Sequence, residues 1–80
     1  MMNVLVGFED GQVFSLDDTG VIRRSTGVPS IIIVRELTKE KLQDYASRGM
    51  KVFPCDSDEK ECLSLVLNKV FPQCKTCKFA

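Results

Sequence analysis

The sequence predicts an α/β (α+β) fold: an N-terminal antiparallel β-meander, then a right-handed β-α-β unit, then a C-terminal helix, with a mixed sheet covered by helices. Three observations support this prediction. Residues 31–34 (IIIV) form a β-branched run, Thr38 begins a helix-like segment, and residues 50–53 alternate apolar and polar side chains. A strand, a helix and a strand in this order close as a right-handed crossover with parallel strands.

The N-terminal third has the pattern of short antiparallel strands. Residues 3–8 and 12–16 are two strand-like runs separated by the turn sequence Glu9-Asp10-Gly11, which predicts a hairpin. A second turn at residues 17–20 (DDTG) precedes a third short strand at residues 21–25. The pattern does not specify the order of these strands in the sheet.

The central unit has clear boundaries. Residues 31–34 are typical of a strand buried on both faces. Thr38 is a good N-cap for the following helix, and Leu37 and Leu42 have the spacing of a hydrophobic staple. Gly49 fits the left-handed position that ends many helices. One face of this helix is expected to face the sheet, and its apolar side chains are Leu42, Tyr45 and Ala46.

A second helix is predicted in the C-terminal part of the chain. Pro54 is expected to end the preceding strand, and Asp56, Ser57 and Asp58 are alternative N-caps. Phe71-Pro72 is expected to stop the helix. Residues 1–72 are therefore predicted to form a single small α/β domain, and residues 73–80 a short Cys-containing tail. The apolar stripe of the helix consists of Leu63, Val66, Leu67 and Val70.

Composition and charge narrow the classes of partner. The 80 residues contain 11 basic and 11 acidic side chains, so the net charge is zero, and 44% are hydrophobic. This composition is typical of soluble globular domains and argues against a nucleic-acid partner bound through a broad basic face. The apolar opening segment has no basic start and soon gives way to Glu9 and Asp10, so we expect no signal peptide, no membrane partner and a cytoplasmic location. Reduced thiols or metal ligands are then the default for cysteine.

The order of elements is loosely similar to that of ribonuclease H-like domains and of small iron–molybdenum-cofactor-binding domains. Motif residues do not support either comparison. The first strand ends in Glu9 where a nuclease of the former type has an aspartate, no clear set of metal-binding acids follows, and the chain has no histidine. We therefore assign the chain to neither family.

The C-terminal CxxC is one candidate site. Cys74 and Cys77 have a spacing suited to zinc or to redox chemistry, so they are the metal or redox candidates, with zinc as the possible cofactor. Free thiols, a local bridge between these two cysteines, and a site completed by a second chain are the alternatives. Cys55 and Cys62 are seven residues apart and do not form the usual second half of such a site.

A ligand-binding edge is the other candidate site. Open α/β sheets usually bind ligands at the carboxyl ends of their parallel strands. Arg35 and Glu36 follow one central strand, and Cys55 and Asp56 follow the other, so we expect these four residues at one edge. A small buried cysteine beside capping carboxylates is the simpler interpretation of Cys55.

Three functional hypotheses follow from these features. The first is a small non-enzymatic interaction or assembly module, with a protein partner or a homodimer formed through an exposed edge strand. The second is a metal-binding or redox-linked protein that uses the CxxC. The third is a small-ligand-binding or enzymatic site at the carboxyl edge of the parallel strands. We favour the first, and no catalytic residue is assigned.

Overall fold

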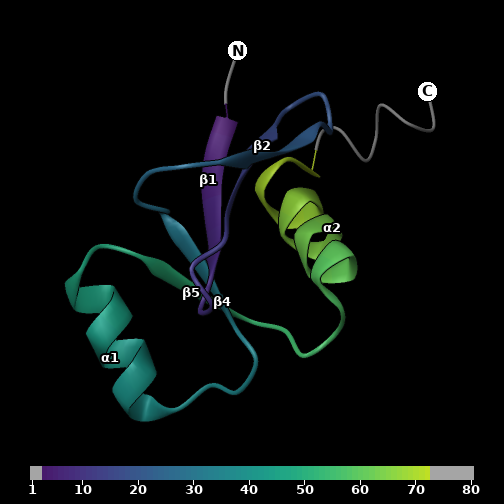
Figure 1. Cartoon of the computed structure of the whole chain (residues 1–80). Helices are drawn as coiled ribbons and strands as arrows, with labels where there is room; N and C mark the ends of the chain where they lie inside the picture. Colours follow the sequence, from purple (N-terminus) through teal and green to yellow (C-terminus); the bar gives the residue numbers. More distant parts are fainter. Residues whose placement is uncertain (1–2, 73–80) are drawn as a thin grey trace.

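Five strands form one mixed sheet, and two helices flank it (Figure 1). The computed structural model describes residues 3–72. The order of strands in the sheet is β3-β2-β1-β4-β5, which confirms the predicted meander, β-α-β unit and C-terminal helix. The strands are β1 (Asn3–Phe8), β2 (Val13–Asp17), β3 (Ile22–Ser25), β4 (Ile31–Val34) and β5 (Lys51–Pro54), and the helices are α1 (Lys39–Ser47) and α2 (Glu59–Val70).

The central strand β1 joins two different halves of the sheet. It pairs antiparallel with β2 and parallel with β4, and its residue Val6 lies beside Phe14 on one side and Ile31 on the other. Because paired residues share a face and side chains alternate along a strand, this register places one set of apolar residues on a common face. That face is the one that α2 covers.

The hydrophobic core lies between the sheet and α2. The rings of Phe8 and Phe14 meet edge to face, with centroids 5.9 Å apart, a favourable geometry for an aromatic pair. From α2, Leu63 and Val66 are 3% and 1% exposed, which confirms the predicted stripe. The buried residues of this cluster are Val6, Phe8, Phe14, Leu16, Ile33, Cys55, Cys62, Leu63 and Val66.

The connection from β3 to β4 crosses the opposite face of the sheet. Pro29 of this connection lies directly over Gly7, so a Cβ atom at Gly7 would be only 2.8 Å from the Pro29 Cγ atom. The Ser30 amide donates a hydrogen bond of 3.0 Å to the carbonyl oxygen of Leu5. Gly7 thus allows the chain to pass closely over the middle of β1.

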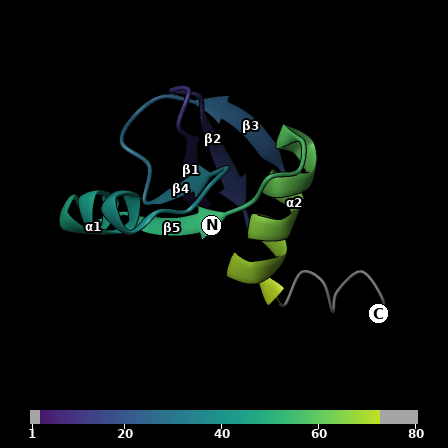
Figure 2. The same cartoon turned by 90° about the horizontal axis from the view of Figure 1, so that it is seen from below.

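Helix α1 begins and ends as predicted but is attached differently. The Thr38 hydroxyl accepts a hydrogen bond from the Lys41 amide at 3.1 Å, and Gly49 has a φ of +83° just beyond the helix. None of the helical residues is buried, and Leu42 is 46% exposed, so the prediction of an apolar stripe packed against the sheet is wrong. Figure 2 shows α1 beside β5, with α2 on the other side of the sheet.

Several boundaries differ in detail from the expectation. The strand expected at residues 50–53 is β5, Lys51–Pro54, and Pro54 ends it as predicted, as the last residue of the strand, paired with Val34. Of the three alternative N-caps for α2, Asp58 is the one used, and its carboxylate accepts from the Glu61 amide at 2.8 Å. Within residues 3–72 no helix is long and apolar enough to cross a membrane. The predicted tail, residues 73–80, lies outside the described residues.

We predict that Gly7→Ala lowers the free energy of unfolding by about 1–3 kcal/mol, because the new methyl group would overlap the Pro29 ring. Urea unfolding of four proteins forms the test: the wild type, Gly7→Ala, Pro29→Ala and the double variant. The Gly7→Ala cost should shrink in the Pro29→Ala background. An equal cost in both backgrounds would show that Pro29 is not the group that excludes a side chain at position 7.

Candidate functional site

The predicted ligand-binding edge exists as a place in the fold. Val34 pairs with Pro54 at the carboxyl ends of β4 and β5, and the Cys55 amide donates to the Val34 carbonyl oxygen at 2.9 Å. Arg35 and Cys55 therefore follow neighbouring strands at the same edge. This placement agrees with the register expected for parallel strands joined by a crossover helix.

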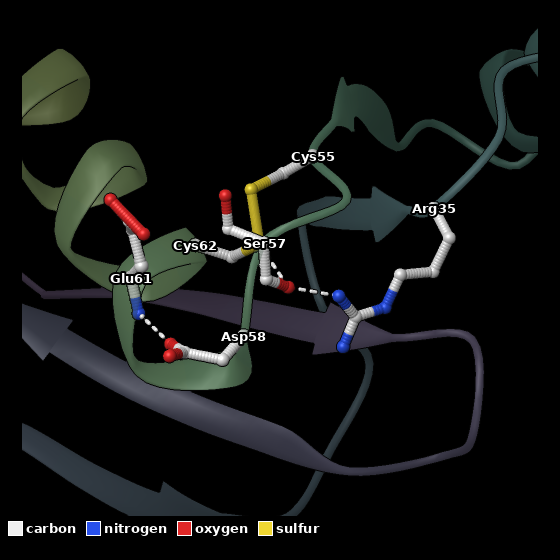
Figure 3. The surroundings of a disulfide bond; sticks show 6 residues. All are labelled: Arg35, Cys55, Ser57, Asp58, Glu61 and Cys62. Carbon is white, nitrogen blue, oxygen red and sulfur yellow. Dashed lines mark hydrogen bonds between the residues drawn. A yellow bond between two sulfur atoms is a disulfide. The ribbon is translucent and has the colours of Figure 1, made fainter.

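Cys55 is joined to Cys62 by a disulfide bond (Figure 3). The two Cα atoms are 5.9 Å apart, and the residues are 9% and 0% exposed. Cys62 is the fourth residue of α2, so the bond links the end of β5 to the first turn of the helix. The default expectation of reduced thiols is thus wrong for this pair. With Asp58 as the N-cap, Cys62 lies in the first turn of the helix, seven residues after Cys55. This short separation across a turn is the sequence feature from which the bond could have been predicted.

The loop between the disulfide partners is fixed by two further contacts. The guanidinium group of Arg35 donates a hydrogen bond to the backbone carbonyl oxygen of Ser57, as Figure 3 shows. The Sγ atom of Cys62 lies 3.4 Å from the same oxygen, within reach of a hydrogen bond from the reduced thiol. Asp58 caps the helix directly after this loop. Arg35 and Cys55 therefore hold α2 against the sheet in the oxidised state.

The two acidic candidates at this edge face solvent. Glu36 and Asp56 are exposed, and within residues 3–72 neither carboxylate takes part in a hydrogen bond or ion pair between side chains. The backbone carbonyl of Glu36 accepts from the Lys41 ammonium group at 3.2 Å. All four candidate residues therefore lie at the same edge of the sheet. Arg35 and Cys55 make structural contacts there, whereas the carboxylates of Glu36 and Asp56 are exposed.

Metal chemistry has no site in the described part of the chain. No group of three or more His, Cys, Asp or Glu residues within residues 3–72 is arranged to hold a metal ion. Cys74 and Cys77 lie outside the described residues, so the zinc or redox hypothesis for them stays a prediction.

Glu9 attaches α1 to the rest of the protein. One carboxylate oxygen lies 3.0 Å from the Lys41 ammonium group, and the other accepts a hydrogen bond of 3.0 Å from the Tyr45 hydroxyl. Lys41 and Tyr45 are four residues apart, so they lie on the same side of α1. Burial raises the pKa of Tyr45 above its ordinary value, and the hydrogen bond and negative charge of Glu9 raise it further. A polar contact thus replaces the apolar packing that the sequence pattern favoured.

A groove at the other end of the sheet is a concave feature that sequence reasoning missed. It lies between the C-terminal half of α2 and the amino ends of β4 and β5, away from the edge with Arg35, and its volume is about 650 Å³. This size is in the range of small-molecule sites. No motif marks these positions, because their residues come from four separate segments. The lining residues are Val4, Ser30, Ile31, Gly49, Lys51, Val52, Phe53, Val66, Lys69 and Val70.

Comparison with known proteins found no matching family model, no matching curated protein and no matching solved structure. The arguments for function therefore depend on two features of the described residues. One is the poorly covered helix α1, and the other is the groove beside α2.

We predict that reduction of the Cys55–Cys62 bond lowers the free energy of unfolding by about 2–3 kcal/mol, because the bond closes a short loop in the unfolded chain. The measurement is urea unfolding with and without a reductant. A Cys74→Ser/Cys77→Ser variant should keep this dependence, whereas a Cys55→Ala/Cys62→Ala variant should lose it. If the free energy of unfolding of the wild type were the same with and without reductant, the bond would not have the stabilising role given to it.

We predict that the phenol of Tyr45, the single tyrosine of the chain, ionises above the ordinary pKa of 10.0. Since the folded-state pKa is raised, the associated stability is fully present below about pH 10 and is lost as the pH rises through the folded value. Ultraviolet absorbance of the phenolate reports the titration directly. Glu9→Gln removes the neighbouring charge and should lower the pKa of Tyr45 towards 10.0.

Glu36→Gln is the matched control for that titration, because its carboxylate contacts neither Tyr45 nor Lys41. It should leave the absorbance curve unchanged. A Glu9→Gln curve that coincides with the wild-type curve would show that Glu9 does not hold the phenol.

Proposed function

We propose that this protein is a small non-enzymatic interaction module that forms a homodimer through α1. The observation that supports this proposal is the exposure of the apolar residues of the helix. Leu37 and Leu42 are 45% and 46% exposed, and α1 buries none of its residues. We call Leu37, Leu42 and Ala46 the α1 surface. An amphipathic helix normally covers its apolar side, so this surface favours association.

A second copy of the chain is the partner that fits this surface best. The net charge is zero, so two copies do not repel each other over long range. Helix α1 itself carries both signs of charge, with Glu40 in its first turn and an ion pair between Asp44 and Arg48. A small domain also gains stability from association, because it buries a limited fraction of its surface alone.

Strand addition is a weaker route to the dimer than the one through α1. At the β5 edge, the strand has four residues, and its last residue, Pro54, has no amide hydrogen to donate to an added strand. At the β3 edge, the strand has four residues, and two of them are Arg23 and Arg24. Short edges with proline or charged residues are typical of sheets that avoid strand pairing.

The proposed location is the cytoplasm. The disulfide restricts this proposal to organisms in which intracellular disulfides are stable. Stable disulfides are rare in the cytosol of most organisms but common in intracellular proteins of hyperthermophiles. We therefore propose the cytosol of a hyperthermophile as the setting in which the oxidised Cys55–Cys62 pair and this location agree.

We predict that Leu37→Ser/Leu42→Ser weakens the dimer by about thirtyfold in its dissociation constant, because two half-exposed leucines lose the apolar area they bury on association. Sedimentation equilibrium over a range of micromolar concentrations measures the constant. Leu65→Ser is the matched control, since Leu65 is 46% exposed but lies on α2. It should dimerise like the wild type.

A wild-type chain that stays monomeric at high micromolar concentration would overturn the proposal. Equal weakening by the α1 variant and by Leu65→Ser would also overturn it, because association would then not involve α1 specifically. Far-ultraviolet circular dichroism confirms that each variant keeps its helices before the constants are compared.

A further inference from the structure

The groove beside α2 has apolar walls that residues 3–72 leave partly uncovered. Val4, Ile31 and Phe53 come from three neighbouring strands, and the register places them on the face that α2 covers. These side chains and Val70 are only partly buried, although they pack against the core. A ligand with an apolar body would remove this area from water at a gain of about 25 cal/mol per Å².

Two lysines give the groove a positive charge. Lys51 reaches it from β5, and Lys69 reaches it from the last turn of α2. Within residues 3–72 no acidic residue lines the groove, and neither lysine takes part in an ion pair. The charge of the site is therefore not balanced by the described part of the protein, and an anion is the complementary group.

We propose that this groove binds a free amphiphilic carboxylate, such as a medium-chain fatty acid. The aliphatic chain lies against Val4, Ile31 and Phe53, and the carboxylate accepts hydrogen bonds from the ammonium groups of Lys51 and Lys69. Charge-assisted hydrogen bonds are stronger than neutral ones, so the head group fixes the orientation of the ligand while the chain supplies most of the affinity.

This site is separate from the proposed dimer surface. None of its lining residues belongs to α1 or to the α1 surface. The Leu37→Ser/Leu42→Ser variant should therefore bind the carboxylate as the wild type does. Failure of the dimer proposal and failure of the ligand proposal can thus be told apart in one set of proteins.

The test is a titration of the full chain with decanoate and with decanol below their aggregation concentrations, followed by backbone amide chemical shifts. We expect shifts at the lining residues and about tenfold tighter binding of decanoate, from two partly solvated charge contacts. Lys51→Met/Lys69→Met should remove the difference between the two ligands while keeping the binding of decanol. Lys39→Met/Lys60→Met, which removes two lysines outside the groove, should preserve the difference.

Three outcomes would overturn the proposal. The first is equal affinity of the wild type for decanoate and decanol, which would show that the two lysines do not bind the carboxylate. The second is a set of shifts located away from the groove. The third is a decanoate preference that survives in Lys51→Met/Lys69→Met. The comparison of the two ligands on the wild type needs no variant, so it stays informative even where a substitution affects folding.

Discussion

The parallel pairing of β1 with β4 is the contact on which the rest of the structure depends. It joins the antiparallel meander to the parallel pair, and its register aligns Val6 with Ile31 and Phe8 with Ile33. A slip of one residue would turn every apolar side chain of one half away from α2. Gly7 lies in the middle of this pairing. Pro29 crosses directly above it and leaves no room for a side chain at this position. The central join and the crossing connection therefore constrain each other.

The two helices are held by different physical means, and this difference explains why the apolar residues of α2 are buried whereas those of α1 are exposed. Helix α2 is packed through buried aliphatic residues, and its first turn is fixed by the disulfide and by the contact of Arg35 with Ser57. Helix α1 is held by polar contacts with Glu9. Because polar contacts need little apolar burial, the leucines of the α1 surface stay exposed, and this exposure is the basis of the dimer proposal.

The edge that the sequence offered as a candidate ligand site contributes structural contacts in the oxidised protein. Cys55 is bonded to Cys62, and the guanidinium group of Arg35 donates to the carbonyl oxygen of Ser57, so both residues help to hold the start of α2. Concavity appears instead at the opposite end of the sheet, where the last turns of α2 leave apolar residues partly uncovered between two lysines. The same helix thus closes one end of the sheet and leaves the other open.

The order of the helices and strands, and their boundaries to within about one residue, follow from local sequence patterns, because these depend on neighbouring residues. The cap at Thr38, the left-handed Gly49 and the apolar spacing of α2 are local signals, and each appears where it was predicted. Four features could be seen only in the folded protein: the strand order, the contacts of α1 with Glu9, the Cys55–Cys62 bond and the groove. Each of these joins residues from separate segments, and their meeting depends on packing and register, which local sequence patterns do not specify.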